Sequence, residues 1–467
     1  MRYFSTNKQA PVVDFKTATI QGQAPDKGLY FPETIPVLDK DFLQNLARFS
    51  NEEIAFRVIQ PYTGDTIPAD KLMEIVKETV NFPFPLVPVT DNTWALELFH
   101  GPTLAFKDVG ARFMSRCLGY FVKTIDQPVT VLVATSGDTG GAVANGFYDV
   151  DGVNVVILYP SGKVSPVQEQ QLTALGKNIH ALEIQGSFDD CQHMVKQAFA
   201  DTELTDKLFL TSANSINVAR WLPQQFYYFF AYKQWTNKTI GPVISVPSGN
   251  FGNICAGLLA QQSGLPVAHF IAACNANDVV TQYLQTGSLD VKPAVATLSN
   301  AMDVGNPSNF VRILEMFAQQ YPAIVSKLSS FSVNDQETEA TIDEVYKKYN
   351  YILDPHGAVG FLSLQRWMER REERERETER EREIERETER ERGEYRSHSV
   401  PRCASYGGIF LETAHPVKFP GAVEKIIGRE IIVPDSLERL MKAEKKSIIM
   451  KPSYQHLKDY LLSGKKV

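Results

Sequence analysis

Lys107 stands in an unusual place for a lysine. It follows the apolar residues Leu104, Ala105 and Phe106 in the stretch HGPTLAFKDVGARFM, where a glycine–proline turn leads into an apolar helix start. Lysine is usually solvated, and burial would lower the pKa of its ammonium group. A neutral amine is what Schiff-base chemistry with an aldehyde needs. The residues leave two interpretations, a surface lysine flanked by core residues or an amine set in a pocket to react.

Two glycine-rich segments have the composition of anion-binding turns. The first is SGDTGG, from Ser136 to Gly141, and the second is PSGNFGN, from Pro247 to Asn253. In each, small residues would let the backbone approach a ligand, and N–H groups at a helix N-terminus attract anions. The alternative for both is a tight turn that only caps a helix. The SGDTGG segment does not have the GxGxxG spacing of a dinucleotide site.

A third segment, SANSINVAR, combines amide, hydroxyl and guanidinium donors. Asn214 and Ser215 lie near an expected helix start, and Arg220 follows in the same segment. An arginine fork with such neighbours suits a phosphate group, whereas the alternative is an N-cap followed by a surface arginine. His356 and His415 are isolated histidines with no serine or cysteine nucleophile pattern around them, and both structural and functional roles stay open.

Together these segments suggest pyridoxal 5′-phosphate as a cofactor. This cofactor needs a lysine for its aldehyde and a cradle for its phosphate, which Lys107 and the glycine-rich turns would supply. A further anion site at Arg220 predicts a substrate that carries a phosphate group of its own.

The elements around these segments predict an α/β fold. β-Branched apolar runs expected to be strands alternate with stretches of helical periodicity, and the clearest runs are 128–135, 153–160, 178–186 and 241–247. Such alternation is typical of right-handed βαβ units in a mostly parallel sheet, where ligands bind beyond the carboxyl ends of the strands. Both glycine-rich segments fall at such ends. Residues 1 to about 90 instead have apolar residues three and four apart, which predicts a helical N-terminal domain.

Composition argues against several classes of protein. The chain has 467 residues, 43% of them hydrophobic, and its net charge of −7 gives no reason to expect a nucleic-acid partner. No apolar run is long enough for a membrane span, and the first residues contain no apolar signal core. The five cysteines are widely spaced with no CxxC, and the eight histidines show no HExxH. We therefore expect reduced thiols, no metal site and a cytoplasmic location.

One segment does not fit the rest of the chain. Residues 369–392 contain twelve glutamates and nine arginines in 24 residues, nearly alternating, with almost nothing apolar to bury. Strict alternation places unlike charges three residues apart but like charges four apart, so helical pairing would be mixed. We expect a solvated excursion that is disordered or loosely helical, with a charge-patterned interaction tract as the alternative.

Five motifs, in this order, resemble those of the threonine synthase family. They are HGPTLAFKD, SGDTGGA, NSINVAR, PSGNFGN and ETAHPVKF, and the opening YFSTNKQAP…PDKGLYFPE is also similar to that of the family. The resemblance covers nearly the whole chain apart from about residues 369–405. It implies a fold-type II pyridoxal-phosphate enzyme with two parallel-sheet α/β domains and a helical N-terminal domain. It also implies conversion of O-phospho-L-homoserine and water into L-threonine and phosphate.

The resemblance implies a role for each site residue. Lys107 would bind the cofactor aldehyde and, once released by the substrate amine, remove the α-proton. The substrate carboxylate and neighbouring groups would contact Ser136, Gly137, Asp138 and Thr139. The cofactor would be held at its phosphate by Gly249, Asn250, Phe251, Gly252 and Asn253, and at its pyridine nitrogen by Thr413. The substrate phosphate would be held by Asn214, Ser215 and Arg220, together with Thr139.

The same resemblance implies a division into domains and leaves rival activities open. Residues 1–90 would form the N-terminal domain, 127–234 a small mobile domain, and 91–126 with 235–467 the large cofactor-binding domain of a monomer or homodimer. The family's link before GIFLETAHP is short, and here it is greatly lengthened, so Thr413 is the site residue on whose placement the insertion bears most. A phospho-lyase that releases 2-oxobutanoate and an inactive homologue disabled by the insertion are the alternatives.

Overall fold

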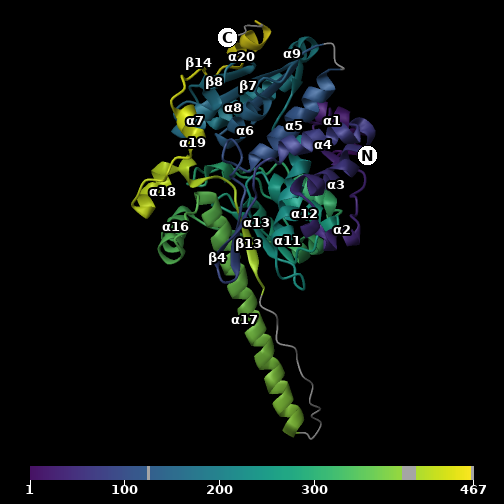
Figure 1. Cartoon of the computed structure of the whole chain (residues 1–467), viewed down its shortest axis with the longest axis vertical. Coiled ribbons are helices and arrows are strands. Elements are labelled where there is room, and N and C mark those ends of the chain that lie inside the picture. The colour runs from purple at the N-terminus through teal and green to yellow at the C-terminus, as the bar shows by residue number, and fades with distance from the viewer. Residues whose placement is uncertain (124–126, 392–405, 464–467) are drawn as a thin grey trace.

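Two sheets organise the molecule. The computed structural model describes residues 1–123, 127–391 and 406–463, and in Figure 1 one sheet lies in the upper part of the view and the other in the middle. Their strands are apolar runs such as VTVLVA at 129–134, in which every residue is buried, as parallel strands between helix layers require. The fold is α/β, as the alternation of strands and helices predicts.

The larger sheet has six strands in the order β12–β11–β10–β13–β5–β4. They run parallel except for β4, which pairs antiparallel with β5 at one edge. The bounds are β4 Leu86–Thr90, β5 Thr93–Glu97, β10 Val243–Pro247, β11 His269–Cys274, β12 Leu328–Ser332 and β13 Gly408–Glu412. Because β5, β13 and β10 are consecutive parallel neighbours, the segments that leave their carboxyl ends meet at one edge of the sheet.

The smaller sheet has five parallel strands in the order β14–β8–β7–β6–β9. The bounds are β6 Val129–Ala134, β7 Val153–Pro160, β8 Ile179–Ile184, β9 Phe209–Thr211 and β14 Ser447–Met450. The runs expected at 128–135, 153–160 and 178–186 are therefore strands of this sheet, and the run at 241–247 is β10 of the other.

The C-terminal segment corrects the expected domain boundary. Residues 235–467 were expected to lie wholly in the large domain, but β14 pairs with β8 of the smaller sheet. Helix α20, Tyr454–Leu462, follows it and buries Leu457 and Leu461 in the same apolar cluster as Leu182 of β8. These apolar side chains complete the edge of the smaller sheet, which explains why the chain returns there.

The N-terminal segment holds a small sheet as well as helices. Strands β1 Arg2–Ser5, β2 Val13–Asp14 and β3 Tyr30–Pro32 form an antiparallel sheet in the order β2–β1–β3. The helices are α1 Phe15–Gln21, α2 Lys40–Gln44, α3 Asn51–Thr63 and α4 Ala69–Thr79, with 3₁₀ turns η1 Leu46–Arg48 and η2 Gly64–Thr66. The expected helical domain of residues 1–90 is corrected in two respects, because it contains this small sheet and because β4 belongs to the six-stranded sheet. The strands of the small sheet could not be predicted, since strands this short leave little periodicity to detect.

The remaining helices surround the two sheets (Figure 1). They are α5 Lys107–Val122, α6 Asp138–Phe147, α7 Pro166–Thr173, α8 Phe188–Ala200, α9 Thr202–Lys207, α10 Val218–Trp221, α11 Phe226–Gln234, α12 Gly252–Gln262, α13 Val279–Thr286, α14 Phe310–Met316, α15 Tyr321–Lys327, α16 Asp335–Tyr349, α17 Pro355–Glu391, α18 Pro420–Ile427 and α19 Asp435–Met441. The 3₁₀ turns are η3 Leu222–Gln225, η4 Asn300–Met302 and η5 Pro416–Lys418. Within the described ranges, no helix combines the length and apolar character that crossing a membrane would need.

Helix α17 has a buried half and an exposed half. As far as Met368 it packs on the six-stranded sheet, with Ala358 and Leu364 buried in the cluster that also contains Phe410 of β13. Beyond Met368 its described side chains are exposed or half-exposed, and the helix projects from the body of the molecule in Figure 1. The same helix thus serves as a core element and then as a solvated extension.

The glutamate–arginine tract is a continuous helix as far as Glu391, and the remainder of the link, 392–405, lies outside the described residues. The tract is not strictly alternating, because a pair of arginines is followed by a pair of glutamates at its start. This places unlike charges four residues apart, and Arg371 and Arg376 form ion pairs with Glu375 and Glu372 at 2.7 and 3.1 Å. Other positions four residues apart carry like charges, as Glu373 and Glu377 do, so the pairing along the tract is mixed, as expected.

The insertion leaves the following strand in register. Strand β13 pairs with β5 over its whole length and with β10 over residues 408–410, with Ile409 opposite Ile244 of β10 and Trp94 of β5. Its five residues are all buried, and Thr413 directly after it is 6% exposed. The core therefore accommodates the lengthened link, as the small entropic cost of a longer surface loop predicts.

We expect deletion of residues 376–391 to leave the stability of the protein almost unchanged. Surface segments without core contacts contribute about 0.5 kcal/mol or less, so the Tm should move by about 2 °C at most. Thermal unfolding followed by circular dichroism measures this. Leu364→Ala, in the buried half of the same helix, is the matched control and should lower the Tm clearly; a comparable loss in the deletion variant would contradict the assignment of the tract as a solvated extension.

Candidate active site

A backbone pairing brings Lys107 and Thr413 together. The loop before Lys107 lies against the segment after β13: the N–H of Phe106 donates to the carbonyl of Thr413 at 2.9 Å, and the N–H of His415 donates to that of Leu104 at 3.1 Å. Leu104 adopts a positive φ of 56°, which turns the chain into this pairing. Lys107 is then the first residue of α5, so the turn, the pairing and the helix start fix its position.

The Lys107 side chain lies inside the molecule, so the surface-lysine interpretation is wrong. Its side chain is 15% exposed, and its Nζ lies 3.7 Å from Oδ2 of Asp138. Burial lowers the pKa of Lys107; the charges of Lys418 and Arg220 act in the same direction, while Asp138 opposes them. The structure thus places a desolvated amine beside a single carboxylate.

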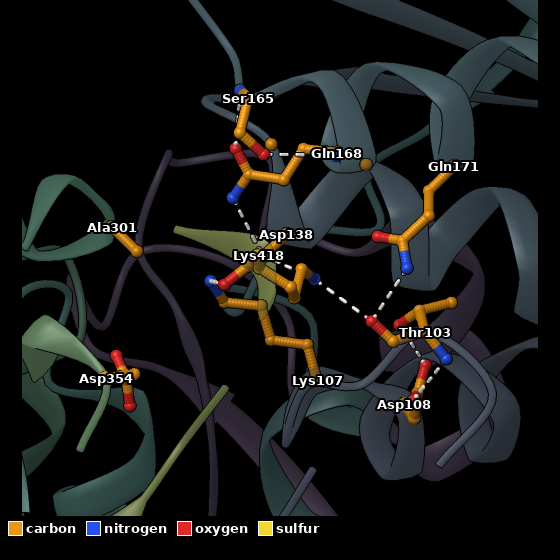
Figure 2. Close-up of polar contacts among 12 residues, drawn as sticks. Thr103, Lys107, Asp108, Asp138, Ser165, Gln168, Gln171, Ala301, Asp354 and Lys418 are labelled. Atoms are coloured by element: carbon orange, nitrogen blue, oxygen red, sulfur yellow. Dashed lines mark hydrogen bonds and ion pairs between the residues drawn. The ribbon is translucent and has the colours of Figure 1, made fainter. Parts of the chain in front are cut away.

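The carboxylate of Asp138 is held by residues from three segments. Its Oδ1 accepts from Nζ of Lys418 at 2.6 Å and from Nε2 of Gln168 at 2.9 Å, as Figure 2 shows. Burial alone would raise the pKa of Asp138, but the charges of Lys418 and Lys107 hold it well below its ordinary value. Asp138 is therefore a buried carboxylate whose ionised form is matched by two cations.

The SGDTGG segment is the turn between β6 and α6. The hydroxyl of Thr135 accepts from the N–H groups of Gly137 and Gly140 at 3.0 and 2.8 Å, which ties the turn to the end of the strand. Gly137 has φ 135°, and a Cβ there would lie 2.4 Å from the side chain of Gln168, so glycine is required. The flanking Ser136 and Thr139 are half-buried, and they are the members of the segment best placed to remain open to a small molecule.

The PSGNFGN segment has the backbone of an anion cradle. Phe251 has φ 61°, and α12 begins directly after it. A Cβ on Gly249 would lie 2.6 Å from Cα of Met302, so only glycine fits at this close approach. Asn250 is fixed from outside, since its carbonyl accepts from the N–H and from Nδ2 of Asn309, each at 3.1 Å. The left-handed turn and the helix N-terminus together favour an anion.

The side chain of Asn253 provides a test of whether this segment fits a phosphate-bearing cofactor. Its Oδ1 accepts from the hydroxyl of Tyr228 at 2.8 Å, which directs the other end of the amide away. Its Nδ2 is buried without a hydrogen-bond partner among the described residues. A buried donor without a partner is costly, and a phosphate oxygen would satisfy it. The residues present therefore fit the group.

Arg220 belongs to the same site, so its interpretation as a surface arginine is wrong. It is 4% exposed, its NH1 donates to the carbonyl of Ala213 at 2.8 Å, and its Nε has no partner within the described ranges. Burial lowers its pKa to about 10, so it stays charged at neutral pH. A Cβ on Gly110 would lie 2.6 Å from the Arg220 carbonyl, which shows that Arg220 packs against the first turn of α5.

Asn309 connects the SANSINVAR segment with the PSGNFGN segment. Its Nδ2 donates to Oγ of Ser215 at 2.9 Å and to the carbonyl of Asn250 at 3.1 Å. A Cβ on Gly252 would lie 3.2 Å from Cβ of Ser215, so the segments also touch directly. Asn214, whose Oδ1 has no partner among the described residues, lies beside Ser215 in the same loop. The structure thus brings the SANSINVAR and PSGNFGN segments together.

Nothing in the sequence indicated Arg312, which holds the SANSINVAR segment by hydrogen bonds to its backbone carbonyls. This fully buried arginine donates to three carbonyls, those of Tyr30, Ser215 and Ile216, at 3.2, 3.1 and 2.6 Å. Its guanidinium also lies 4.3 Å from the ring centroid of Trp221. Apart from Oδ1 of Asn309 at 2.6 Å, its hydrogen-bond partners are carbonyls remote in sequence, so the contacts that hold the segment could not be identified from a local pattern.

The buried acids near Thr413 were also missed. Glu412 and Asp354 are both fully buried, and burial followed by the charge of Asp354 raises the pKa of Glu412 well above its ordinary value. His356, left open by the sequence, has a structural place: its Nδ1 lies 2.5 Å from Oδ1 of Asp354, and its Nε2 accepts from the N–H of Ala301 at 3.2 Å. Ala301 immediately precedes the residue against which Gly249 packs.

His415 is half-buried and forms the cap of η5. Its Nδ1 accepts from the N–H of Val417 at 3.1 Å, and its ring packs edge-on against Phe99 with centroids 5.1 Å apart. Burial lowers the pKa of His415 to about 4, so it is neutral at pH 7. These contacts give it a structural place next to Thr413 and Lys418.

Comparison with known proteins gives a consistent result along the chain. Three family models match in succession: Threonine synthase N terminus over residues 2–80, Pyridoxal-phosphate dependent enzyme over 83–378, and Threonine synthase, C-terminal over 396–461. A threonine synthase from Haemophilus influenzae is 41% identical over 465 residues, covering 99% of this chain and 100% of the relative.

Solved structures agree with the sequence comparison. The crystal structure of threonine synthase from Escherichia coli matches with a TM-score of 0.86 at 38% identity, covering 100% of both chains. The structure of PLP-bound threonine synthase from Brucella melitensis matches with a TM-score of 0.85 at 36% identity, covering 99% of this chain and 98% of that one.

We expect Arg312→Met to lower the free energy of unfolding by roughly 3 kcal/mol, because buried carbonyls lose their donors. Urea denaturation measures the change. Arg2→Met is the control, since Arg2 is exposed and only 3.6 Å from Glu33 in a surface pair, and it should be nearly neutral. An unchanged midpoint in Arg312→Met would contradict the role given to this arginine.

Proposed function

Because this chain belongs to the threonine synthase family of pyridoxal-phosphate-dependent enzymes, we propose that it converts O-phospho-L-homoserine and water into L-threonine and phosphate. The observation that carries the proposal is the buried Lys107 amine, which lies where the SGDTGG turn, the GNFGN cradle and the Arg220 segment converge. One amine and several anion-binding segments match a substrate with a carboxylate and a phosphate, used with a phosphate-bearing cofactor.

The cofactor would be held at both ends by this chain. The backbone of Gly249 to Asn253 and the free Nδ2 of Asn253 would bind its phosphate, and Lys107 would bind its aldehyde. Thr413, fixed by the pairing of its carbonyl with Phe106, would offer a neutral hydroxyl to the ring nitrogen. When bound, pyridoxal phosphate supplies an electron sink that stabilises negative charge on the substrate carbons.

The substrate would bind between the two sheets. Ser136 and Thr139, with the backbone of Gly137 and Asp138, would receive its carboxylate at the N-terminal end of α6. Arg220, whose Nε has no partner in the described part of the chain, would pair with its phosphate together with Asn214 and Ser215. Binding at both ends would fix the reacting carbons next to Lys107.

Lys107 would carry the proton transfers. Released from the cofactor by the substrate amine, its neutral Nζ would accept the α-proton and hold it as an ammonium beside Oδ2 of Asp138. A base would take a second proton from Cβ, and phosphate would leave from Cγ, where the cationic Arg220 would stabilise it. Delivery of that proton to Cγ would form the methyl group, and water would supply the hydroxyl at Cβ and a proton to the released phosphate. Return of the first proton from Lys107 to Cα would complete threonine. Burial suits Lys107 to both directions of transfer, because it lowers the pKa of the amine.

The setting of the reaction can also be proposed. We infer a small-molecule enzyme of the cytoplasm that acts as a monomer or homodimer, with a mobile smaller sheet. Cys117, Cys191, Cys255 and Cys274 support a reducing compartment, because they are buried and unpaired, while Cys403 lies outside the described residues.

Product identity separates this activity from its closest rival. We expect purified enzyme with O-phospho-L-homoserine to release threonine and phosphate, and Lys107→Ala to yield neither while folding normally. Lys177→Ala, a surface lysine paired with Asp149 at 2.5 Å, is the control and should keep full activity. Chromatography of the organic product is the measurement. Formation of 2-oxobutanoate without threonine would establish a phospho-lyase instead, and absence of any product would support an inactive homologue.

Arg220→Ala should act mainly on substrate affinity. Removing a buried, charged donor to the substrate phosphate should raise KM about tenfold or more, because hydrogen bonds to charged groups contribute roughly 1.5–3 kcal/mol. Steady-state kinetics with Arg2→Ala as the exposed-arginine control measures this. An unchanged KM in a folded variant would remove Arg220 from the phosphate site.

A further inference from the structure

Lys418 is a buried cation that the proposed reaction does not use. Its side chain is 0% exposed, and its Nζ donates to Oδ1 of Asp138 at 2.6 Å and to the carbonyl of Thr103 at 3.0 Å. Lys418 follows β13 of the six-stranded sheet, whereas Asp138 opens α6 after β6 of the other sheet. The ion pair therefore joins the two halves of the molecule directly beside Lys107, as Figure 2 shows.

Asp138 divides its two oxygens between two lysines. Lys418 and Gln168 both donate to Oδ1, at 2.6 and 2.9 Å, whereas Oδ2 lies 3.7 Å from Nζ of Lys107. With Oδ1 fixed by two donors, the carboxylate cannot rotate freely, and Oδ2 stays on the side of Lys107.

The segment around Thr103 fixes Lys418 as well. The Thr103 carbonyl accepts from both Lys418 and Nε2 of Gln171, each at 3.0 Å. The hydroxyl and N–H of Thr103 both donate to Asp108, the second residue of α5. Lys418 is thus held by the loop that delivers Lys107, so the positions of the two lysines are coupled through that loop.

We propose that Lys418 is a positioning residue for the Lys107 amine: it holds the Asp138 carboxylate in a fixed place between the two sheets and neutralises it there. The inference rests on the proposed function, because it takes Lys107 as the residue that binds the cofactor and moves the proton. Without Lys418, Asp138 would present an uncompensated charge to Lys107 and to the turn where the substrate carboxylate binds. The amine would then retain its proton, and the substrate anion would be repelled.

The charged groups around Lys107 and Lys418 determine whether a substitution raises or lowers the pKa of Lys107. Lys107 is faced by Asp138, Lys418 and Arg220, and Lys418 in turn acts on Asp108 and His415. Apart from burial, Asp138 raises the pKa of Lys107, and the two cations lower it. Loss of Lys418 should therefore favour protonation at Lys107 Nζ, and loss of the Asp138 charge should disfavour it.

The test is a pH titration of the visible absorbance of the holoenzyme, which reports protonation at the nitrogen of the lysine that binds the cofactor. We expect Lys418→Met to raise the midpoint by on the order of one pH unit and Asp138→Asn to lower it. Lys418→Arg keeps the cation and should stay near the wild type. Lys445→Met is the control, since Lys445 pairs with Glu169 at 2.6 Å and with Glu183 at 3.0 Å rather than with Asp138, and its midpoint should be unchanged.

The double variant Asp138→Asn/Lys418→Met distinguishes a charge effect from simple damage. Removing both charges should bring the midpoint closer to the wild type than either single variant does. If Lys418→Met alone does not give folded holoenzyme, recovery of folding and of a near wild-type midpoint in the double variant supports the proposal. A midpoint in Lys418→Met equal to that of the wild type overturns it, as does a double variant that recovers neither property.

Kinetics and a Lys107 control separate this inference from the proposed function. Lys418→Met should lower kcat and raise KM together, and the loss in kcat should be smaller at high pH, where the amine loses its proton more readily. Lys107→Ala should abolish the pH-dependent band. If the pH-dependent band survives in Lys107→Ala, the proposed function is wrong. If the band is lost in Lys107→Ala but its midpoint is unchanged in Lys418→Met, only the role proposed for Lys418 is wrong.

Discussion

The site depends on the backbone ladders that hold β13 between β5 and β10. Because the three strands are parallel, their carboxyl ends open on one edge, and each end delivers a different group: the Lys107 loop, the Thr413–Lys418 segment and the glycine–asparagine cradle. The short pairing between residues 104–106 and 413–415 continues the β5–β13 contact beyond the sheet. A shift of β13 by one residue would exchange its buried faces and move Thr413 and Lys418 together.

Burying several charges at this edge requires that each be matched. Lys107 and Lys418 share the carboxylate of Asp138, and Arg220 is a further buried cation that acts on Lys107. Two further donors at this edge, Nδ2 of Asn253 and Nε of Arg220, are buried without hydrogen-bond partners in the described part of the chain. Such groups are costly in a folded protein unless a ligand satisfies them, as the proposed cofactor and substrate would.

The local sequence pattern was sufficient to predict the α/β class and most strands, because apolar β-branched runs and helical periodicity can be recognised within a few residues. The candidate site residues were predicted from motifs at the ends of those strands. Lys418 and Arg312 could not be found in this way, since their partners Asp138 and Tyr30 are close only after folding. The pairing of β14 with β8 was missed for the same reason. Thr413 directly follows β13, and that strand remains in register after the insertion.

Helix α17 also affects the shape of the molecule in solution. At about 1.5 Å per residue, the stretch from Glu369 to Glu391 extends roughly 35 Å beyond the body. A rod of this length adds little mass but much friction. The protein should therefore tumble more slowly and more anisotropically than a sphere of its molecular weight, and size-based separations should overestimate its mass.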